Sequence, residues 1–319
     1  MRKGQNPAKF INQVSKPQRI TVIVLNYIPF LSGFYSQTLD VLKTCLGSIW
    51  ENTDLPYDLM VFDNGSCEEA VEFLVEAQQQ GKIQYLLLSE KNVGKGGAWN
   101  VTLNAAPGEI LAYTDNDAYF YPGWLSKSVQ ILETFPQVGM VTSRPFRTPP
   151  ELYSQTIAWA ETTPGVSIEH GKFIPWEAFK AFDMSLGTAE ADVRQRYENT
   201  EDVRLTYNGL TAQIGASHWQ FVSYKSVIQH FLPFDMDKPM GQVRQLDRRV
   251  NDAGYLRLMP VEFLAQNMSN RLDWVHAPEE AQPKTTPKSS LRSRIIELPF
   301  ARRVLLGIHD RIFRLYYDS

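Results

Sequence analysis

The sequence predicts an α/β fold, in which a mostly parallel sheet is flanked by helices. Short apolar runs rich in β-branched residues alternate with segments of helical periodicity, and this alternation is typical of βαβ units. Of the 319 residues, 43% are hydrophobic and 21% are charged, as in ordinary globular proteins. The composition therefore argues against disordered, collagen-like and coiled-coil chains.

The first part of the chain follows this alternation in order. Residues 20–25 form a continuous apolar run, which predicts a strand buried on both faces. The expected elements after it are a helix over 39–49, a strand over 58–62, a helix after Ser66, a strand over 83–88, a helix over about 98–106 and a strand over 110–113.

The second part of the chain is less regular. Residues 147–212 contain several prolines and little periodicity apart from a polar helix near 188–200, so we predict an insertion over the edge of the sheet. A strand over 218–224 and a helix over 242–253 complete a main domain that is predicted to span residues 20–283.

Both ends of the chain are predicted to lie outside that domain. Residues 1–19 form a basic tail without acidic residues. Residues 284–319 combine a linker with a basic amphipathic helix, whose apolar residues recur at intervals of three and four. The stretch 291–319 is expected either to rest on anionic phospholipid or to pack on the protein's own core.

The charge distribution and the number of cysteines indicate which binding partners and which cellular compartment to expect. The net charge is −3 and the middle of the chain is acidic between its basic ends, which argues against binding of nucleic acid there. Cys45 and Cys67 are too few for a disulfide framework, so we expect a cytoplasmic protein, with the inner face of the membrane as a peripheral site. A signal peptide and a membrane-spanning run are not expected.

Four polar clusters follow the predicted strands directly. They are Asn26, Asp63 with Asn64, the stretch from Asn92 to Gly97, and the stretch from Asp115 to Asp117. Ligands of such sheets bind beyond the carboxyl ends of the strands, where loops and helix N-termini converge. The sequence therefore predicts a binding site at this edge.

Asp115 and Asp117 are the strongest candidates for a metal site. Two carboxylates one residue apart at a strand end can face one ligand, and their hard oxygens suit Mg²⁺ or Mn²⁺ bound jointly to a diphosphate. The alternative is a turn in which the Asp and Asn side chains bond their own backbone.

The other clusters also have a structural and a functional interpretation. Asp63 either closes a turn in which Ser66 caps the next helix, or accepts a hydrogen bond from a nucleobase or a ribose. Gly94 and Lys95 open a segment that fits neither the dinucleotide fingerprint nor a P-loop. Glycines before a helix still let a phosphate approach its N-terminus.

The ordered set of these motifs resembles family 2 glycosyltransferases of the GT-A fold over about residues 20–142 and again over 215–255. The resemblance implies a nucleotide-binding half and an Asp-x-Asp metal motif. By the same resemblance, Asp63 reads the base, Asp115 lies near the ribose and the metal, and Asp117 is the direct metal ligand. Asn26, Asn64 and Asn92 belong to the same expected nucleotide site.

The second half departs from the family pattern. Gln242 and Val243 stand where relatives carry the acidic pair that supplies the catalytic base, so Asp247, Asp237 and Asp235 are the remaining candidates for that base. Asn267 stands where many relatives have a metal-binding histidine.

His276, nine residues after Asn267, is therefore a candidate metal ligand. His218 is a second histidine for which metal binding is conceivable, although packing is the more common role of a single histidine.

These observations favour inverting transfer of a sugar from a nucleoside diphosphate to an acceptor hydroxyl, with Mn²⁺ or Mg²⁺ as cofactor. The acceptor would be a glycan, a polysaccharide precursor of the cell envelope or a lipid-linked precursor, covered by residues 147–212. Two alternatives remain open. One is a protein that binds nucleotide sugars or glycans without catalysis, and the other is a nucleotidyltransferase, which usually has a glycine-rich loop after its first strand.

Overall fold

The computed structural model describes residues 4–185, 188–237 and 243–272. The described residues all belong to one compact unit. The predicted linker and amphipathic helix of 284–319 lie outside the described residues, as does His276. None of the described helices is long and apolar enough to span a membrane.

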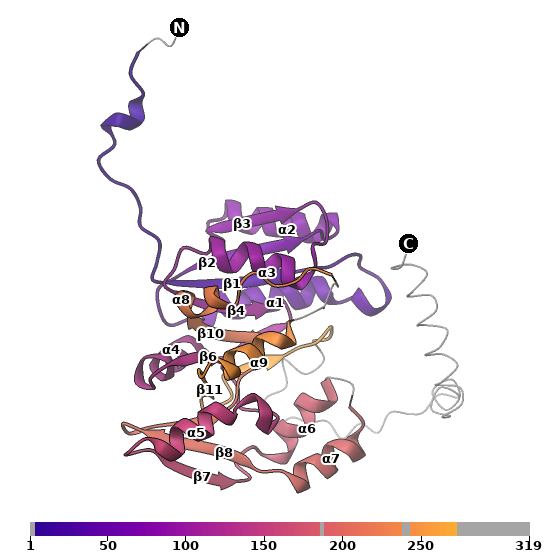
Figure 1. The fold of residues 1–319 in the computed structure, drawn as a ribbon. Coiled ribbons are helices and arrows are strands. Elements are labelled where there is room, and N and C mark those ends of the chain that lie inside the picture. The colour runs from indigo at the N-terminus through magenta and orange to yellow at the C-terminus, as the bar shows by residue number, and fades with distance from the viewer. Residues whose placement is uncertain (1–3, 186–187, 238–242, 273–319) are drawn as a thin grey trace, which may run out of the picture. The chain divides into compact units, whose positions relative to one another are not determined.

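A ten-stranded sheet forms the centre of the unit (Figure 1). Seven of its strands run in one direction, and β7, β9 and β10 run in the other. In spatial order the strands are β3 (Tyr85–Ser89), β2 (Tyr57–Asn64), β1 (Ile20–Asn26), β4 (Ile110–Asp115), β10 (Gln220–Tyr224), β6 (Val138–Val141), β11 (Leu256–Met259), β9 (Leu210–Ile214), β8 (Asp202–Tyr207) and β7 (Ser167–Gly171).

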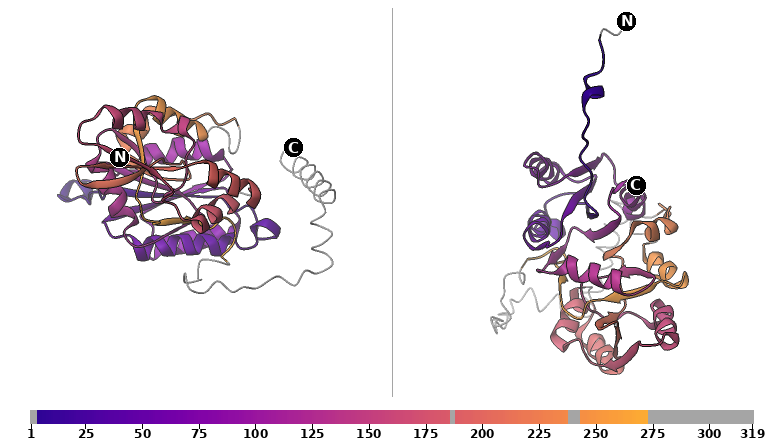
Figure 2. Two further views of the ribbon diagram at one scale, coloured as in Figure 1. Left: turned by 90° about the horizontal axis from the view of Figure 1, so that it is seen from below. Right: turned by 90° about the vertical axis from the view of Figure 1, so that its left-hand side faces the viewer.

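Two more strands and the helices surround this sheet, and helices cover both of its faces (Figure 2). The strands β5 (Ala118–Phe120) and β12 (Ala265–Asn267) pair with each other. The α-helices are α1 (Thr38–Asn52), α2 (Glu68–Gln79), α3 (Gly94–Ala105), α4 (Trp124–Thr134), α5 (Ser154–Thr162), α6 (Trp176–Ser185), α7 (Glu190–Asn199), α8 (Lys225–Ile228) and α9 (Arg244–Asp252). Short 3₁₀ turns are η1 (Pro7–Phe10), η2 (Gly33–Tyr35), η3 (Pro150–Leu152) and η4 (Gln229–Phe231).

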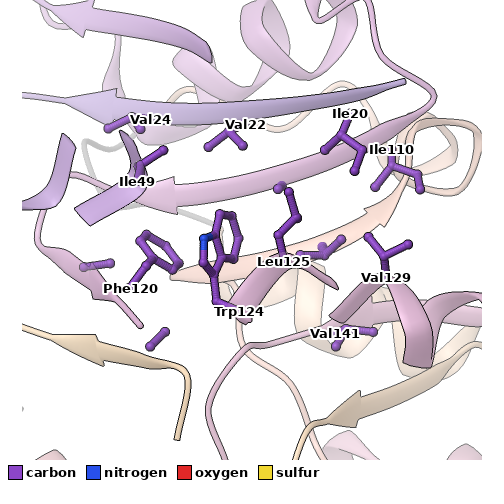
Figure 3. Packing of buried hydrophobic residues seen from close by; sticks show 14 of the residues in the cluster. Ile20, Val22, Val24, Ile49, Ile110, Phe120, Trp124, Leu125, Val129 and Val141 are labelled. Atoms are coloured by element: carbon purple, nitrogen blue, oxygen red, sulfur yellow. The ribbon is translucent and has the colours of Figure 1, made fainter. Parts of the chain in front are cut away.

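Alternating residues of the buried strands build two apolar layers. Val22 and Val24 of β1 face α1 and α4, where Trp124 packs near Phe120 with ring centroids 4.2 Å apart (Figure 3). Ile23 and Leu25 of the same strand face the opposite layer, which contains side chains of α3 and α9. Because neighbouring strand residues point to opposite faces, a strand covered by helices on both sides is apolar throughout.

The predicted α/β fold is confirmed, and the expected strands and helices are present. One boundary differs: the helix expected from about residue 98 begins at Gly94, so the glycine-rich segment is its first turn. Residues 147–212 contain three strands, β7, β8 and β9, that the sequence analysis did not identify. They continue the main sheet beyond β11, beside α5, α6 and α7 (Figure 1).

Candidate functional site

The polar clusters meet at one edge of the sheet. Asn26 pairs in register with Asp63 across β1 and β2, and Leu25 pairs with Asp115 across β1 and β4. Since β1, β2 and β4 are parallel, all three strands end at this edge. The predicted convergence of Asn26, Asp63 and Asp115 is present in the structure.

A buried hydrogen-bond network connects these strand ends. The Nδ2 of Asn116 donates to Oδ1 of Asn26 (2.6 Å), and Nδ2 of Asn26 donates to Oδ1 of Asp63 (2.8 Å). The other oxygen of Asp63 accepts from the backbone N–H of Ser66 (3.0 Å). Asp63 is 1% exposed with both oxygens engaged, so it holds the edge together, and its contact with a nucleobase remains a prediction.

Ser66 was predicted to cap the following helix, and this prediction is wrong. The N-cap residue of α2 is Cys67, without a side-chain hydrogen bond. The Oγ of Ser66 instead accepts from the backbone N–H of Ile28 (2.9 Å) and from Asn26 (3.0 Å). The hydroxyl is thereby used to fix the chain that leaves β1.

Asn64 and Asn92 close the loop that precedes α3. The Oδ1 of Asn64 accepts from the N–H of Val93 (2.9 Å), and its Nδ2 donates to Oδ1 of Asn92 (3.0 Å). The same oxygen of Asn92 accepts from the N–H of Gly94 (2.8 Å). Both asparagines satisfy backbone groups of this turn, and ligand contact by either remains a prediction.

Asp115 is held by two neighbours. The Nζ of Lys95 lies 2.7 Å from its Oδ2, and the hydroxyl of Tyr113 donates to its Oδ1 (2.6 Å). Burial raises the pKa of Tyr113 well above its usual value, so this hydroxyl stays a donor. Tyr113 was not among the predicted site residues. It lies two residues before Asp115 on β4, and residues at this spacing share a face of the strand.

Asp117 has one oxygen without a partner. Its Oδ2 accepts from Nδ2 of Asn267 (3.2 Å), whereas its buried Oδ1 has no hydrogen-bond partner in the part of the chain that the structure describes. Burial and the nearby charge of Asp115 raise the pKa of Asp117 to about 7. A buried carboxylate oxygen left unpaired is costly, and a divalent cation would compensate it.

The residues therefore fit a divalent cation held by Asp115 and Asp117. Within the described ranges, no group of three or more His, Cys, Asp or Glu side chains could hold a metal ion, so further ligands would come from a bound molecule or from elsewhere in the chain. Asn267 lies beside Asp117, which is where the family resemblance places it.

The raised pKa of Asp117 predicts a pH-dependent stability. In the unfolded chain an Asp titrates near 3.9, so between pH ~4 and pH ~7 the folded metal-free protein binds more protons. Its free energy of unfolding should therefore fall as the pH rises through this window. Asp117→Asn removes this effect. In urea unfolding with EDTA, the free energy of unfolding of the variant should exceed that of the wild type by more at pH 8 than at pH 5. Equal gains at both pH values would contradict the assignment.

A cavity of about 360 Å³ opens beside Asp117. It lies between the end of β1, the start of α1 and the loop after β12, and a cavity of this volume falls within the range of small-molecule sites. Its lining residues are Tyr27, Phe34, Tyr35, Thr38, Val41, Asn116, Asp117, Asn267, Ser269 and Asn270.

Gly96 of α3 lets the backbone of a neighbouring loop approach the helix closely. A Cβ on Gly96 would lie 2.5 Å from the backbone oxygen of Asp235. Asn100 secures the same loop, since its Oδ1 accepts from the N–H of Phe234 (2.7 Å) and its Nδ2 donates to the carbonyl of Phe234 (2.8 Å). Close approach of this loop explains Gly96 without a phosphate, and nucleotide contact by Gly94 and Lys95 remains a prediction. The carboxylates of Asp235 and Asp237 are exposed on this loop.

Gly96→Ala is expected to destabilise the domain by about 1–3 kcal/mol, because the new methyl group would displace the backbone of the loop. Chemical unfolding measures the loss, and limited proteolysis near residues 232–237 should become faster. Gly47→Ala in α1 is the matched control, since a Cβ there meets nothing within 4 Å. An unchanged stability of Gly96→Ala would show that the loop does not rest on this glycine.

Asp247 lies in a buried ion-paired cluster. It is 5% exposed, and its Oδ1 accepts from Nη2 of Arg257 at 2.6 Å. Its Oδ2 lies 2.5 Å from Nδ1 of His218. In the described residues His218 belongs to no group of three or more His, Cys, Asp or Glu side chains that could hold a metal ion, and its pairing with Asp247 supports a role other than metal binding. The sequence analysis did not foresee this cluster, because its members are far apart in the chain.

The middle of the chain matches a known family. Residues 34–183 match the model described as glycosyl transferase family 2. This segment is similar to glycosyl transferase family 2. The resemblance expected from the motifs is thereby confirmed, and the matched residues include Asp63, Lys95, Asp115 and Asp117.

Two curated relatives carry the same description. An uncharacterized glycosyltransferase of Nostoc sp. is 27% identical over 123 residues, which are 39% of this chain and 35% of the relative. An uncharacterized glycosyltransferase of Methanocaldococcus jannaschii is 28% identical over 110 residues, 34% of this chain and 38% of the relative. The alignments thus span little more than a third of the relatives' lengths.

Solved structures of glycosyltransferases are also similar to this chain. The mannosyltransferase PcManGT from Pyrobaculum calidifontis, in complex with GDP-Man and Mn²⁺, has a TM-score of 0.46 at 18% identity, covering 77% of this chain and 55% of PcManGT. Residues 1–349 of S. aureus TarS have a TM-score of 0.45 at 13% identity, covering 78% of this chain and 59% of that structure.

Proposed function

We propose that this protein is an inverting glycosyltransferase that moves a sugar from a nucleoside diphosphate to an acceptor hydroxyl. The observation that carries the proposal is the buried, unpaired Oδ1 of Asp117 next to Asp115, at the carboxyl edge of the sheet and beside a cavity. Such a pair of carboxylates suits a divalent cation that is shared with a diphosphate. The family match of residues 34–183 supports the same class of reaction.

The cavity suits the nucleoside of the donor. Tyr27, Phe34 and Tyr35 contribute aromatic surface to it, and the rings of Phe34 and Tyr35 are in edge contact with centroids 5.1 Å apart. Nucleobases stack on aromatic side chains with little dependence on their identity. We therefore place the base near these rings and the diphosphate next to Asp117.

The residues at the sheet edge have distinct roles in this proposal. Asp115 and Asp117 would hold Mn²⁺ or Mg²⁺, which when bound offsets the charge that develops on the departing diphosphate. Lys95 and Tyr113 fix the two oxygens of Asp115, so its carboxylate is oriented before the donor arrives. Asn267 orients the carboxylate of Asp117 through its Oδ2.

The acceptor and the cellular location remain predictions. We propose a glycan, a polysaccharide precursor of the cell envelope or a lipid-linked precursor as the acceptor, next to residues 147–212, and a cytoplasmic enzyme. Membrane contact through 291–319 is part of the same proposal. The three strands that extend the sheet beyond β11 support an acceptor side there, because they add a surface beyond the nucleotide-binding half.

A second candidate function is binding of a nucleotide sugar or glycan without transfer. It is favoured by Val243, which stands at one of the usual acidic positions and is 3% exposed among apolar side chains of the layer that contains α3 and α9. Such a side chain cannot accept a proton. The other position, Gln242, lies outside the described residues.

A donor screen tests both functions. The purified full chain is incubated with uridine, guanosine, cytidine and thymidine diphosphate sugars, with Mn²⁺ or with EDTA, and mass spectrometry follows release of the nucleoside diphosphate. Calorimetry measures binding of UDP and GDP in parallel. Metal-dependent binding with release supports a transferase, binding without release supports the second function, and the absence of any binding would contradict both.

A further inference from the structure

We propose that His218 is the catalytic base that takes the proton of the acceptor hydroxyl, and that Asp247 and Arg257 position it. The inference rests on the proposed transferase function and adds the group that would complete its site. Its basis is a His–Asp–Arg cluster that the metal site and the nucleotide cavity do not use.

His218 lies at the same sheet edge as the two metal-site carboxylates. Strand β10 pairs antiparallel with β4, with Gln220 opposite Thr114. One residue further, the backbone N–H of Asp115 donates to the carbonyl of Trp219 (3.0 Å). His218 precedes Trp219 directly, so its backbone lies next to the Asp115–Asp117 turn.

The nucleotide cavity and His218 flank this turn from different strands. Asn116 and Asp117 line the cavity together with Tyr27 from the end of β1, whereas His218 comes from the start of β10 on the other side of β4. We place the sugar of a donor whose diphosphate is held at Asp117 over β4, between the cavity and β10. An acceptor that approaches from the β10 side meets the histidine.

The imidazole of His218 is held by one nitrogen. Its Nδ1 lies 2.5 Å from Oδ2 of Asp247, and its Nε2 makes no hydrogen bond to any residue within the described ranges. The side chain is 19% exposed, so part of the imidazole faces solvent. A carboxylate at Nδ1 keeps the proton on that nitrogen and leaves the lone pair on Nε2, as in the Asp–His pair of serine proteases.

Arg257 fixes the carboxylate in turn. It is fully buried, and its Nη2 donates to Oδ1 of Asp247 (2.6 Å) and to the carbonyl of Ala216 (2.5 Å). Its Nη1 donates to the carbonyl of Leu152 (2.5 Å). Since both oxygens of Asp247 are occupied and the residue is buried, Asp247 acts through His218 and does not meet an acceptor itself.

The proton and the electron pairs balance in a single displacement. Nε2 of His218 accepts the proton of the acceptor hydroxyl, and the acceptor oxygen forms a bond to the anomeric carbon. The bond from this carbon to the diphosphate oxygen breaks, and its electron pair leaves with the nucleoside diphosphate. The imidazolium that forms is paired with Asp247.

Variants of His218 and Asp247 test the assignment with the full chain, Mn²⁺ and whichever nucleotide sugar the screen shows to turn over. His218→Gln should lower kcat about 10²–10⁴-fold while the Kd of UDP or GDP stays within about twofold. His218→Asn keeps a hydrogen-bond donor to Asp247, and its kcat should fall as much as that of His218→Gln. The exposed His230 on η4 supplies the control, because His230→Gln should keep full turnover.

Asp247→Asn separates a positioning role from a structural one. It should lower kcat less than His218→Gln does and change the shape of the pH–rate profile, since the imidazole loses the carboxylate that holds its Nδ1. Imidazole ¹⁵N spectra, with the His218 signal assigned from His218→Gln, give a readout that needs no turnover. They should show that the neutral imidazole carries its proton on Nδ1.

The outcomes distinguish this inference from the proposed function. A wild-type protein that binds no nucleotide overturns the function and the inference together, and binding without turnover overturns the inference in favour of the binding protein. Normal binding with unchanged kcat in His218→Gln overturns the role of His218 alone, as does protonation of its Nε2 that persists to pH 9. A kcat loss in Asp235→Asn or Asp237→Asn, but not in His218→Gln, assigns the base to the loop before α9.

Discussion

Asp117→Asn is expected to weaken Mn²⁺-dependent binding of UDP or GDP by about 100-fold or more. The substitution removes one of two carboxylates that would hold the cation, and an amide oxygen is a far weaker ligand for a hard divalent ion. The buried Oδ1 of Asp117 has no other partner in the described residues, so a bound cation would depend strongly on it. Calorimetry with and without Mn²⁺ measures the change.

The metal-free variant should be at least as stable as the wild type, which excludes unfolding as the cause of lost binding. Burial and the charge of Asp115 raise the pKa of Asp117 to about 7, so its ionised form destabilises the metal-free fold at pH 8. The Tm of Asp117→Asn in EDTA should therefore equal or exceed that of the wild type. Asp192→Asn, on the exposed face of α7, is the matched control and should bind normally. Equal nucleotide affinity of Asp117→Asn and wild type in Mn²⁺ would remove the metal assignment.

Trp99→Ala is expected to reduce the free energy of unfolding by about 3–5 kcal/mol, a large part of the stability of an ordinary domain. Trp99 is fully buried on α3. Its ring lies 5.2 Å from that of Tyr113 and 5.1 Å from that of Phe234, with near-perpendicular contact to Phe221 at 6.1 Å. Removal of the indole would leave a cavity between α3, β4 and the loop of residues 232–237.

The same substitution should also disturb the sheet edge. The Nζ of Lys95 lies 5.5 Å from the centre of the Trp99 ring, and Tyr113 packs against that ring, so both partners of Asp115 rest on it. We expect Trp99→Ala to weaken nucleotide binding in the fraction that remains folded. Trp99→Phe should lose less stability and less nucleotide binding, because it keeps an aromatic ring at this position.

Chemical unfolding and calorimetry on these variants check both effects. Val101→Ala on the same helix is the control, since Val101 is 42% exposed and should change the stability by no more than about 0.5 kcal/mol. A Trp99→Ala protein as stable as Val101→Ala would show that the indole does not support the core.

The sequence by itself determined the first four strands of the sheet and the edge where β1, β2 and β4 end. Residues 20–25 are predicted as a strand buried on both faces, and β1 is indeed buried at every residue, because a continuous apolar run is a local property of the sequence. The chain direction of parallel strands then brings Asn26, Asp63 and Asp115 to one edge. No long-range information beyond the βαβ pattern is needed for this step.

Part of the second half could not be predicted because its elements are stabilised by tertiary contacts. The strands β7 to β9 are short, and β7 is mostly exposed, so they carry no continuous apolar run. They form because β9 pairs with the edge strand β11. Strand β8 then pairs with β9, and β7 pairs with β8. Whether a strand pairs with a sheet edge depends on the position of that edge in the tertiary structure. Local sequence patterns do not contain this information.

The roles of individual polar residues were likewise decided by the tertiary structure. Asp247 appeared in the sequence as an isolated acid on a helix, and only the fold brings His218 and Arg257 to its two oxygens. Gly96 appeared as a place for a phosphate, whereas the fold lays the backbone of Asp235 against it. Hydrogen bonds and close approaches of this kind join residues far apart in the chain, so sequence can supply the residue types but not their partners.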